Sequence, residues 1–305
     1  MRPRFARRRV EAPPSDAEPA IFIVGVARSG TTLLRLMLDA HPDLAIPPET
    51  HFIPQVIRAC ERSDDPASAA LEVITTHRRW PDFGLDAEQL RARLESHRDL
   101  GPGDALRAFY GLYAAQHQKR RWGDKSTNYV RKMRPISRVL PEARYVHLIR
   151  DGRDVALSLV DVHFGPETIA GAAEKWSSEI TRARRQSRRL PHYTEVRYEQ
   201  LVADPEPMLR SVCEAMALPW DDAILNYQER AGGRIAEIAR DFDRAAGDAV
   251  PAEVRAGHQA NVSKPLQASR AARWRSEMSA ADLARFERIA GETLDDLGYA
   301  RARPA

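Results

Sequence analysis

The stretch AIFIVGVARSGTTLLRLMLDAHPDLAIPPETHFI, residues 20–53, decides the fold of this chain. It begins with an apolar run, Ile21 to Val24, which is typical of a buried strand. A tight turn with two glycines follows (GVARSGTT, residues 25–32), and an apolar-periodic helix begins at about Thr31. This order predicts a phosphate site, because the N–H groups of such a loop and the positive end of the helix converge on one anion.

The loop departs from the Walker A consensus G-x-x-x-x-G-K-[ST] at one position, where Thr31 replaces the lysine. That lysine reaches the β- and γ-phosphates of a nucleoside triphosphate, so its absence argues against ATP or GTP. An arginine, Arg28, lies inside the loop instead. We therefore expect Ser29, Gly30, Thr31 and Thr32 to hold a nucleotide phosphate, with an ordinary strand-to-helix turn as the alternative.

Length and composition indicate one large α/β domain with a full core, because the chain has 305 residues. It carries 47 basic and 43 acidic side chains, and five of the arginines stand in the first ten residues. The remainder is nearly neutral, which argues against a nucleic-acid groove. No apolar run approaches the ~18 residues of a membrane span, and no signal peptide is recognisable, so a cytoplasmic location is expected. The two cysteines, Cys60 and Cys213, form no metal-ligand pattern.

Along the chain, strand patterns alternate with helix patterns, which predicts a parallel sheet. The fold class expected is α/β, a P-loop-like three-layer α/β/α arrangement with a central, mostly parallel sheet and a helical insertion. We predict a basic tail over 1–19, one domain over 20–299 with the insertion at about 56–120, and a short tail over 300–305. Further strands are expected at 121–125, 144–149 and 193–197. Helices are expected at 49–62, 128–139, from 155 onward, and at 167–190, 205–230 and 280–297, with a mobile loop over 231–262.

A second motif, YVHLIRDGRDVALS, occupies residues 145–158. A strand ends in Arg150, a turn opens the next helix, and Ser158 lies two turns into that helix. Ligands bind at the carboxyl ends of strands in open α/β sheets, and a guanidinium there can grip a second phosphate. The alternative for Arg150 is a surface ion pair with Asp151 or Asp154.

Together the two motifs resemble those of the sulfotransferases that use 3′-phosphoadenosine-5′-phosphosulfate (PAPS). That family carries an R/K-S-G-T-T loop for the 5′-phosphosulfate and a strand–R-D-G-R-helix–Ser element for the 3′-phosphate. The stretch from RSGTTLLRLMLDAHP to ET, residues 28–50, is similar to the tyrosylprotein branch, as are RYEQL (197–201), KP (264–265) and RW (273–274). The similarity covers about residues 20–55, 121–160, 193–220 and 262–299.

The resemblance implies in-line sulfuryl transfer from PAPS, with PAP as product and no metal. Glu49 matches the catalytic glutamate of the branch and is expected to be the base, with a helix N-terminal glutamate as the alternative. His51 is the fallback base, ahead of His41 and His147. Arg28 and Lys125 are expected to stabilise the transferring group. A solvated pair of Lys125 with its neighbouring aspartate is the alternative.

The resemblance also implies a set of cofactor-binding residues: Arg28, Ser29, Gly30, Thr31, Thr32, Arg150, Ser158, Tyr198, Lys264 and Arg273. Lys264 and Arg273 would act from a C-terminal loop that covers the cofactor. For Tyr198, packing beside the third strand is an equal alternative. The arginines between 182 and 189 are interpreted as a solvated helix face, with docking of an acidic acceptor as the alternative.

The acceptor is expected to be a hydroxyl of a small molecule, with a peptide tyrosine as the alternative. Pro48 and His51 replace a glutamate and an arginine of the tyrosylprotein branch, which weighs against the peptide. Two other classes are the alternatives: a P-loop kinase or NTPase, and a nucleotide-binding module without catalysis. No nucleic acid or membrane span is expected, and a homodimer is left open.

Overall fold

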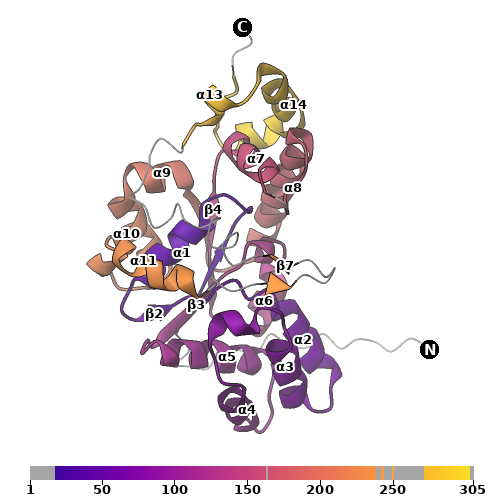
Figure 1. Cartoon of the computed structure of the whole chain (residues 1–305), viewed down its shortest axis with the longest axis vertical. Coiled ribbons are helices and arrows are strands. Elements are labelled where there is room, and N and C mark those ends of the chain that lie inside the picture. Colours follow the sequence, from indigo (N-terminus) through magenta and orange to yellow (C-terminus); the bar gives the residue numbers. More distant parts are fainter. Residues whose placement is uncertain (1–17, 163, 238–241, 244–248, 251–270, 303–305) are drawn as a thin grey trace, which may run out of the picture.

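The computed structural model describes residues 18–162, 164–237, 242–243, 249–250 and 271–302. At its centre lies a five-stranded sheet in the order β2-β3-β1-β4-β5, in which every neighbouring pair is parallel (Figure 1). Its strands are β1 (Ala20–Val24), β2 (Leu44–Ala45), β3 (Arg121–Lys125), β4 (Ala143–Ile149) and β5 (Tyr193–Arg197). Because all five strands run the same way, the loops that follow them meet at one edge of the sheet.

Helices cover both faces of the sheet, which confirms the expected three layers (Figure 1). On one face lie α1 (Thr31–Asp39), α9 (Tyr198–Ala203), α10 (Pro205–Ala215), η3 (Asp222–Ile224) and α11 (Gln228–Ala236). On the other lie η2 (Thr127–Arg131), α6 (Met133–Val139), α7 (Gly152–Val160), α8 (Ile169–Ser187) and α14 (Ala280–Asp296). Strand β1 alternates accordingly, because Ile21 and Ile23 pack on the first face and Phe22 and Val24 on the second.

The segment between β2 and β3 is helical and gathers at one end of the molecule (Figure 1). It contains α2 (Ile53–Arg62), α3 (Pro66–Thr75), η1 (Trp80–Phe83), α4 (Ala87–Glu95) and α5 (Pro102–Gln116). The remaining elements are β6 (Phe242–Asp243) and β7 (Ala249–Val250), which pair antiparallel, and α13 (Trp274–Glu277).

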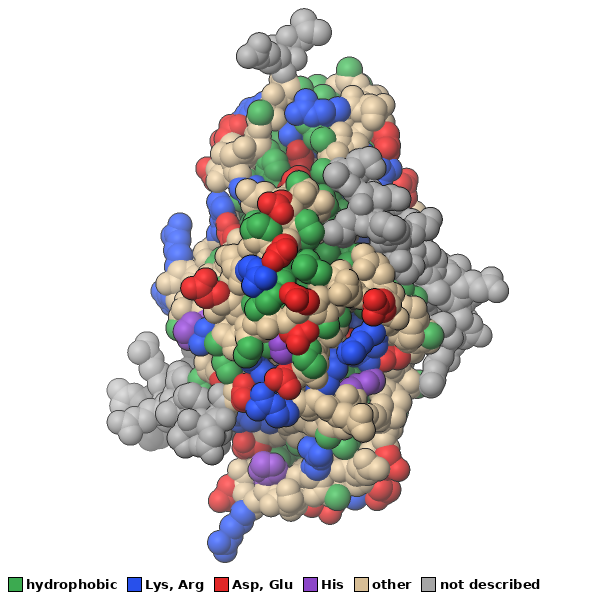
Figure 2. Space-filling model, turned by 90° about the vertical axis from the view of Figure 1, so that its left-hand side faces the viewer, with side chains coloured by type: hydrophobic (Ala, Val, Ile, Leu, Met, Phe, Trp, Pro, Cys, Tyr) green, Lys and Arg blue, Asp and Glu red, His purple; other side chains and the backbone are tan. Residues whose placement is uncertain are grey.

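Figure 2 shows the face formed by α9, α10 and α11, where acidic and basic side chains are interspersed. In the described part of the chain no helix is long and apolar enough to cross a membrane.

Several element boundaries differ from the sequence prediction. Helix α2 begins at Ile53 rather than at Glu49, because His51 has a left-handed backbone (φ 61°) that a helix cannot include. Glu49 is therefore a loop residue, and its interpretation as a helix N-terminal glutamate is wrong. Helix α7 begins three residues early, where the Asp151 carboxylate accepts the N–H of Arg153. The expected loop over 231–262 contains the end of α11, and most of the rest lies outside the described residues.

Candidate active site

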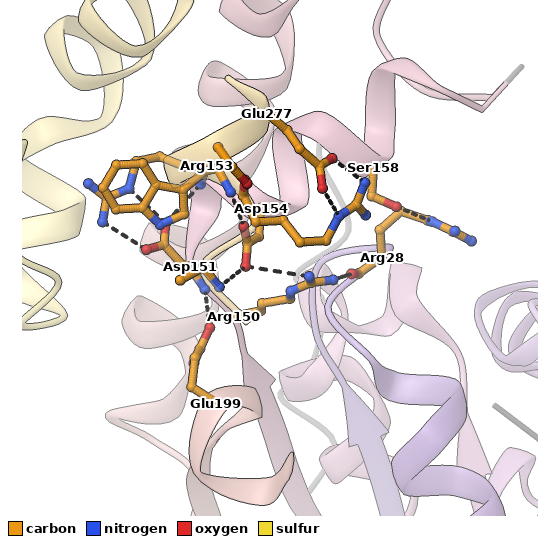
Figure 3. Close-up of polar contacts among 12 residues, drawn as sticks. Arg28, Arg150, Asp151, Arg153, Asp154, Ser158, Glu199 and Glu277 are labelled. Carbon is orange, nitrogen blue, oxygen red and sulfur yellow. Dashed lines mark hydrogen bonds and ion pairs between the residues drawn. The ribbon is translucent and has the colours of Figure 1, made fainter. Parts of the chain in front are cut away.

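The two predicted phosphate motifs lie side by side at the carboxyl ends of the neighbouring strands β1 and β4 (Figure 3). The Arg28 Nε donates to the hydroxyl of Ser158 at 2.9 Å, and the Arg150 Nη1 donates to the carbonyl of Arg28 at 3.2 Å. Arg28 also has a left-handed backbone, with φ 71°. The fold thus joins residues about 130 positions apart into one cationic cluster, because parallel strands present their following loops at the same edge.

Tyr198, at the start of α9, links the glycine loop to Arg150. The guanidinium carbon of Arg150 lies 4.6 Å from the centre of the Tyr198 ring, a cation–π contact. The same ring leaves no space at Gly30, where an added Cβ would meet a ring carbon at 2.5 Å, and Gly30 has φ 95°. Glycine is therefore required at position 30 both for its backbone and for the close approach of Tyr198.

The N-terminus of α1 is open to an anion. Its cap residue is Gly30, no side chain caps it, and its first turn carries no acidic residue. The hydroxyl of Ser29, at a residue only 1% exposed, has no hydrogen-bond partner among the described residues. Uncapped N–H groups, a buried hydroxyl and a helix dipole together suit a phosphate or sulfate group.

Asp154 connects this cluster to the C-terminal segment. Its Oδ2 lies 3.4 Å from the Arg150 Nη2 and accepts the N–H of Ala272 at 2.8 Å, while its Oδ1 accepts the N–H of Trp274 at 2.9 Å. Burial raises the pKa of Asp154, against the opposite effect of Arg150 and of these N–H groups. Arg273 lies between Ala272 and Trp274 in the sequence, and its guanidinium pairs with Glu277 at 2.5 Å.

A second cluster lies across the glycine loop, around Glu49. The ammonium of Lys125, at the end of β3, donates to the Glu49 Oε1 at 2.6 Å and to the hydroxyl of Thr32 at 3.3 Å. The His51 Nε2 lies 2.8 Å from the Glu49 Oε2. Lys125 thereby joins the predicted base to the phosphate loop, and both carboxylate oxygens of Glu49 have a nitrogen partner.

The charges of this cluster determine the protonation of Glu49. Burial alone would raise the pKa of Glu49, but Lys125 and His51 outweigh it and hold that pKa well below its ordinary value. Burial likewise lowers the pKa of Lys125, although Glu49 opposes that shift. Glu49 is therefore ionised at neutral pH and is available to accept a hydrogen bond.

A buried polar network under Glu49 was not found by sequence reasoning. The hydroxyl of Thr50 donates to the Asp124 Oδ2 at 2.8 Å and lies 2.9 Å from the hydroxyl of Tyr129. The hydroxyl of Tyr110 donates to the same Asp124 oxygen at 2.8 Å, and the N–H of Thr50 donates to Ser126. The only sequence signal for it was the run of polar residues that ends β3, because the partner tyrosines come from separate helices.

The structure thus brings most of the predicted site residues into two adjoining clusters. The alternative pairing of Lys125 with Asp124 is wrong, because Lys125 pairs with Glu49. The alternative for Arg150 is correct in its partner, Asp154, but the pair is buried rather than at the surface, and Arg150 also contacts the loop. Lys264 lies outside the described residues.

The two remaining histidine candidates lie in other surroundings. His41 contacts the carbonyl of Pro219, and His147 is buried against Tyr193 on β5. Over the ranges the structure describes, no group of His, Cys, Asp and Glu side chains could hold a metal ion.

Comparison with known proteins places these features in a family. A model described as "Sulfotransferase family" matches residues 19–222. Protein-tyrosine sulfotransferase 1 of Danio rerio is 27% identical over 92% of this chain, and protein-tyrosine sulfotransferase 2 of Gallus gallus is 30% identical over 72% of it. The chain spans 72% of the length of the first relative, 56% of the second and 40% of the Drosophila melanogaster enzyme.

Solved structures agree with this placement. The sulfotransferase domain from the Synechococcus PCC 7002 olefin synthase has a TM-score of 0.60 and 26% identity, with 92% of this chain and 96% of that one covered. The sulfotransferase domain from the curacin biosynthetic pathway shares the fold with a TM-score of 0.60 at 22% identity. Since the family match spans most of the chain and includes both βα loops of the site, the chain belongs to the sulfotransferase family.

Proposed function

We propose that this chain transfers a sulfuryl group from PAPS to the phenolic hydroxyl of a tyrosine in a peptide or protein. One observation carries the proposal: Lys125 bridges Thr32 of the phosphate loop and the ionised carboxylate of Glu49. This contact puts an anion cradle, a cation and a proton acceptor at one point, which is what in-line transfer to a hydroxyl requires. The protein-tyrosine sulfotransferases among its relatives support tyrosine as the acceptor.

The residues present fit a doubly phosphorylated adenosine. The open N-terminus of α1 and the buried hydroxyl of Ser29 suit the 5′-phosphosulfate. Arg150 and Ser158, on the neighbouring βα connection, would hold the 3′-phosphate, with Tyr198 stacked against Arg150. PAPS, when bound there, supplies the activated sulfuryl group, and PAP is the leaving group.

The chain's own residues then have distinct roles. Glu49 accepts a hydrogen bond from the acceptor hydroxyl, so that the proton leaves as the oxygen bonds to sulfur. Lys125 and Arg28 neutralise the charge that develops on the sulfuryl oxygens and on the leaving phosphate. Arg28 acts by charge alone, because a guanidinium keeps its proton.

A second candidate is transfer to the hydroxyl of a small molecule. It is favoured by the similarity to the sulfotransferase domain of an olefin synthase, which extends over nearly the full length of both chains. His51, which stands beside Glu49 where the tyrosylprotein branch has an arginine, also favours a different acceptor. The two candidates share the donor site and differ only in the acceptor.

The acceptor is tested by incubating the protein with radiolabelled PAPS and either a tyrosine peptide or a small phenol. We expect label in the peptide, and none in a matched peptide with phenylalanine in place of tyrosine. Label in the phenol alone would establish the second candidate. If neither acceptor is labelled and PAP does not raise the melting temperature, the proposed function is rejected, the more so if ATP with Mg²⁺ does raise it.

The donor assignment has its own test in Arg150→Ala. We expect this change to reduce the rise in melting temperature caused by PAP far more than the rise caused by adenosine 5′-phosphosulfate, which lacks the 3′-phosphate. The loss of one guanidinium–phosphate contact should raise the Kd for PAP at least ~10-fold, because hydrogen bonds to charged groups contribute about 1.5–3 kcal/mol. Equal weakening of both nucleotides would remove Arg150 from the 3′-phosphate site.

A further inference from the structure

The backbone of Ile46, three residues before Glu49, is held by charged side chains from two helices. Its N–H donates to the Asp39 Oδ1 at 2.7 Å. Its carbonyl accepts from the Arg35 Nε at 2.9 Å and from the Arg234 Nη2 at 3.3 Å. Asp39 and Arg35 belong to α1, whereas Arg234 belongs to α11, so this peptide is fixed from two directions.

Arg234 ties these groups together through a two-pronged ion pair. Its Nε and Nη2 donate to the two oxygens of Asp39 at 2.6 and 2.7 Å, and its Nη1 donates to Glu237. The side chains of Arg234 and Asp39 are 12% and 4% exposed. Burial would raise the pKa of Asp39, but Arg234 and Lys119 outweigh it and keep the carboxylate ionised. Paired charges at this depth hold a fixed geometry.

The position of Ile46 is passed on to Glu49 by a stiff connection. Pro47 and Pro48 are both buried, and each proline ring fixes its φ angle. On the far side of Glu49, the Thr50 hydroxyl is anchored to Asp124. Glu49 therefore stands between two anchored residues, Ile46 and Thr50. The first anchor depends in part on Arg234, which is 188 positions from Ile46 in the sequence.

We propose that Arg234 is a positioning residue for Glu49: by clamping Asp39 and Ile46, it holds the Glu49 carboxylate against Lys125. This inference rests on the proposed sulfuryl transfer, in which Glu49 takes the acceptor proton. Removal of the guanidinium leaves the Ile46 carbonyl with Arg35 as its one remaining side-chain donor and leaves Asp39 without its two-pronged partner. A displacement of about 1 Å at a reacting group can cost ~100-fold in rate.

The test compares Arg234→Gln with Arg107→Gln, a matched control. Arg107 also makes a two-pronged pair with a buried carboxylate, that of Glu142 at 2.8 and 3.0 Å, and its other carboxylate partner is Asp104, so both partners lie outside the segment 46–50 that carries Glu49. We expect Arg234→Gln to lower kcat about 10- to 100-fold per folded enzyme, with the Kd for PAP within about twofold of wild type. Arg107→Gln should lose stability while keeping its kcat.

Arg234→Lys provides a milder variant if Arg234→Gln does not fold. Lysine retains the charge but not the forked geometry of the guanidinium. We therefore expect a kcat between those of Arg234→Gln and the wild type, with unchanged PAP binding. An unchanged kcat in either Arg234 variant, or a kcat loss of the same size in Arg107→Gln, overturns the inference. Failure of the proposed sulfuryl transfer is recognised separately, because the wild-type protein would then neither bind PAP nor transfer a sulfuryl group to the peptide or the phenol.

Discussion

Glu49 illustrates how residue identity and surroundings combine. A carboxylate is a weak base when cations depress its pKa, and here Lys125 and His51 each occupy one of its oxygens. In the proposed reaction, an acceptor hydroxyl therefore shares or replaces one of these partners. His51 is the partner at the more open side, since 21% of its side chain is exposed against 4% for Lys125. We therefore expect the proposed acceptor to approach Glu49 past His51.

At this scale we predict that Glu49→Gln lowers kcat by about 10²–10⁴-fold, because the amide cannot take the proton. PAP binding should persist, since Glu49 contacts the phosphate loop only through Lys125. The measurement is single-turnover transfer alongside a PAP titration. Glu179→Gln, which alters a buried carboxylate paired with Arg131, is the control and should be active. Full activity of Glu49→Gln would exclude Glu49 as the base.

The element that organises the phosphate end of the site is the N-terminus of α7. Arg153 there donates to Asp151 at 3.0 and 2.8 Å, to Glu287 on α14 at 2.9 Å, and to the carbonyl of Ala300. Its guanidinium carbon also lies 3.6 Å from the centre of the Trp274 ring. One side chain thus joins α7 to α13, to α14 and to the residues around Ala300 that follow α14.

We predict that Arg153→Ala lowers the free energy of unfolding by about 3–5 kcal/mol, because it leaves the buried carboxylate of Asp151 and the half-buried carboxylate of Glu287 without their cation. Amide hydrogen exchange should show α14 opening before the sheet. The exposed Arg301, which pairs with Asp295 near the same terminus, offers a control, and Arg301→Ala should change stability little. Equal effects of the two changes would contradict the joining role of Arg153.

For the whole molecule, one buried and two half-buried histidines link stability to pH. Burial lowers the pKa of His77, His117 and His147 to about 4 each. Each is therefore neutral in the folded protein at a pH where the unfolded chain binds a proton. Between about pH 6.5 and pH 4 the unfolded state binds more protons, so acid favours unfolding.

We predict that the free energy of unfolding falls as the pH falls from 6.5 to 4. His147, which is fully buried and lies 2.6 Å from the hydroxyl of Tyr193, contributes at most about 3 kcal/mol of this loss. Urea unfolding at a series of pH values measures it, with His147→Gln as the comparison. If the free energy of unfolding of His147→Gln falls as steeply with pH as that of the wild type, the effect arises from other groups.

The local pattern of the chain was sufficient to predict the fold class and the strand, glycine loop and helix over residues 20–39. The apolar run at 21–24, the glycine at position 30 and the helix after it are decided by neighbours in sequence, through strand periodicity and backbone freedom. The same holds for the second motif, where a strand, a turn and a helix place Arg150 at the edge of the sheet. The family followed from these two motifs and is confirmed.

Tertiary structure alone decided which charges face one another. The start of α2 depended on the left-handed backbone of His51, and the pairing of Lys125 with Glu49 depended on β3 lying beside β2, the strand that precedes Glu49. The clamp of Arg234 on Asp39 joins residues 195 positions apart. Periodicity and turn chemistry act over a few residues, whereas a buried ion pair forms only after whole helices have packed, so no local pattern announces it.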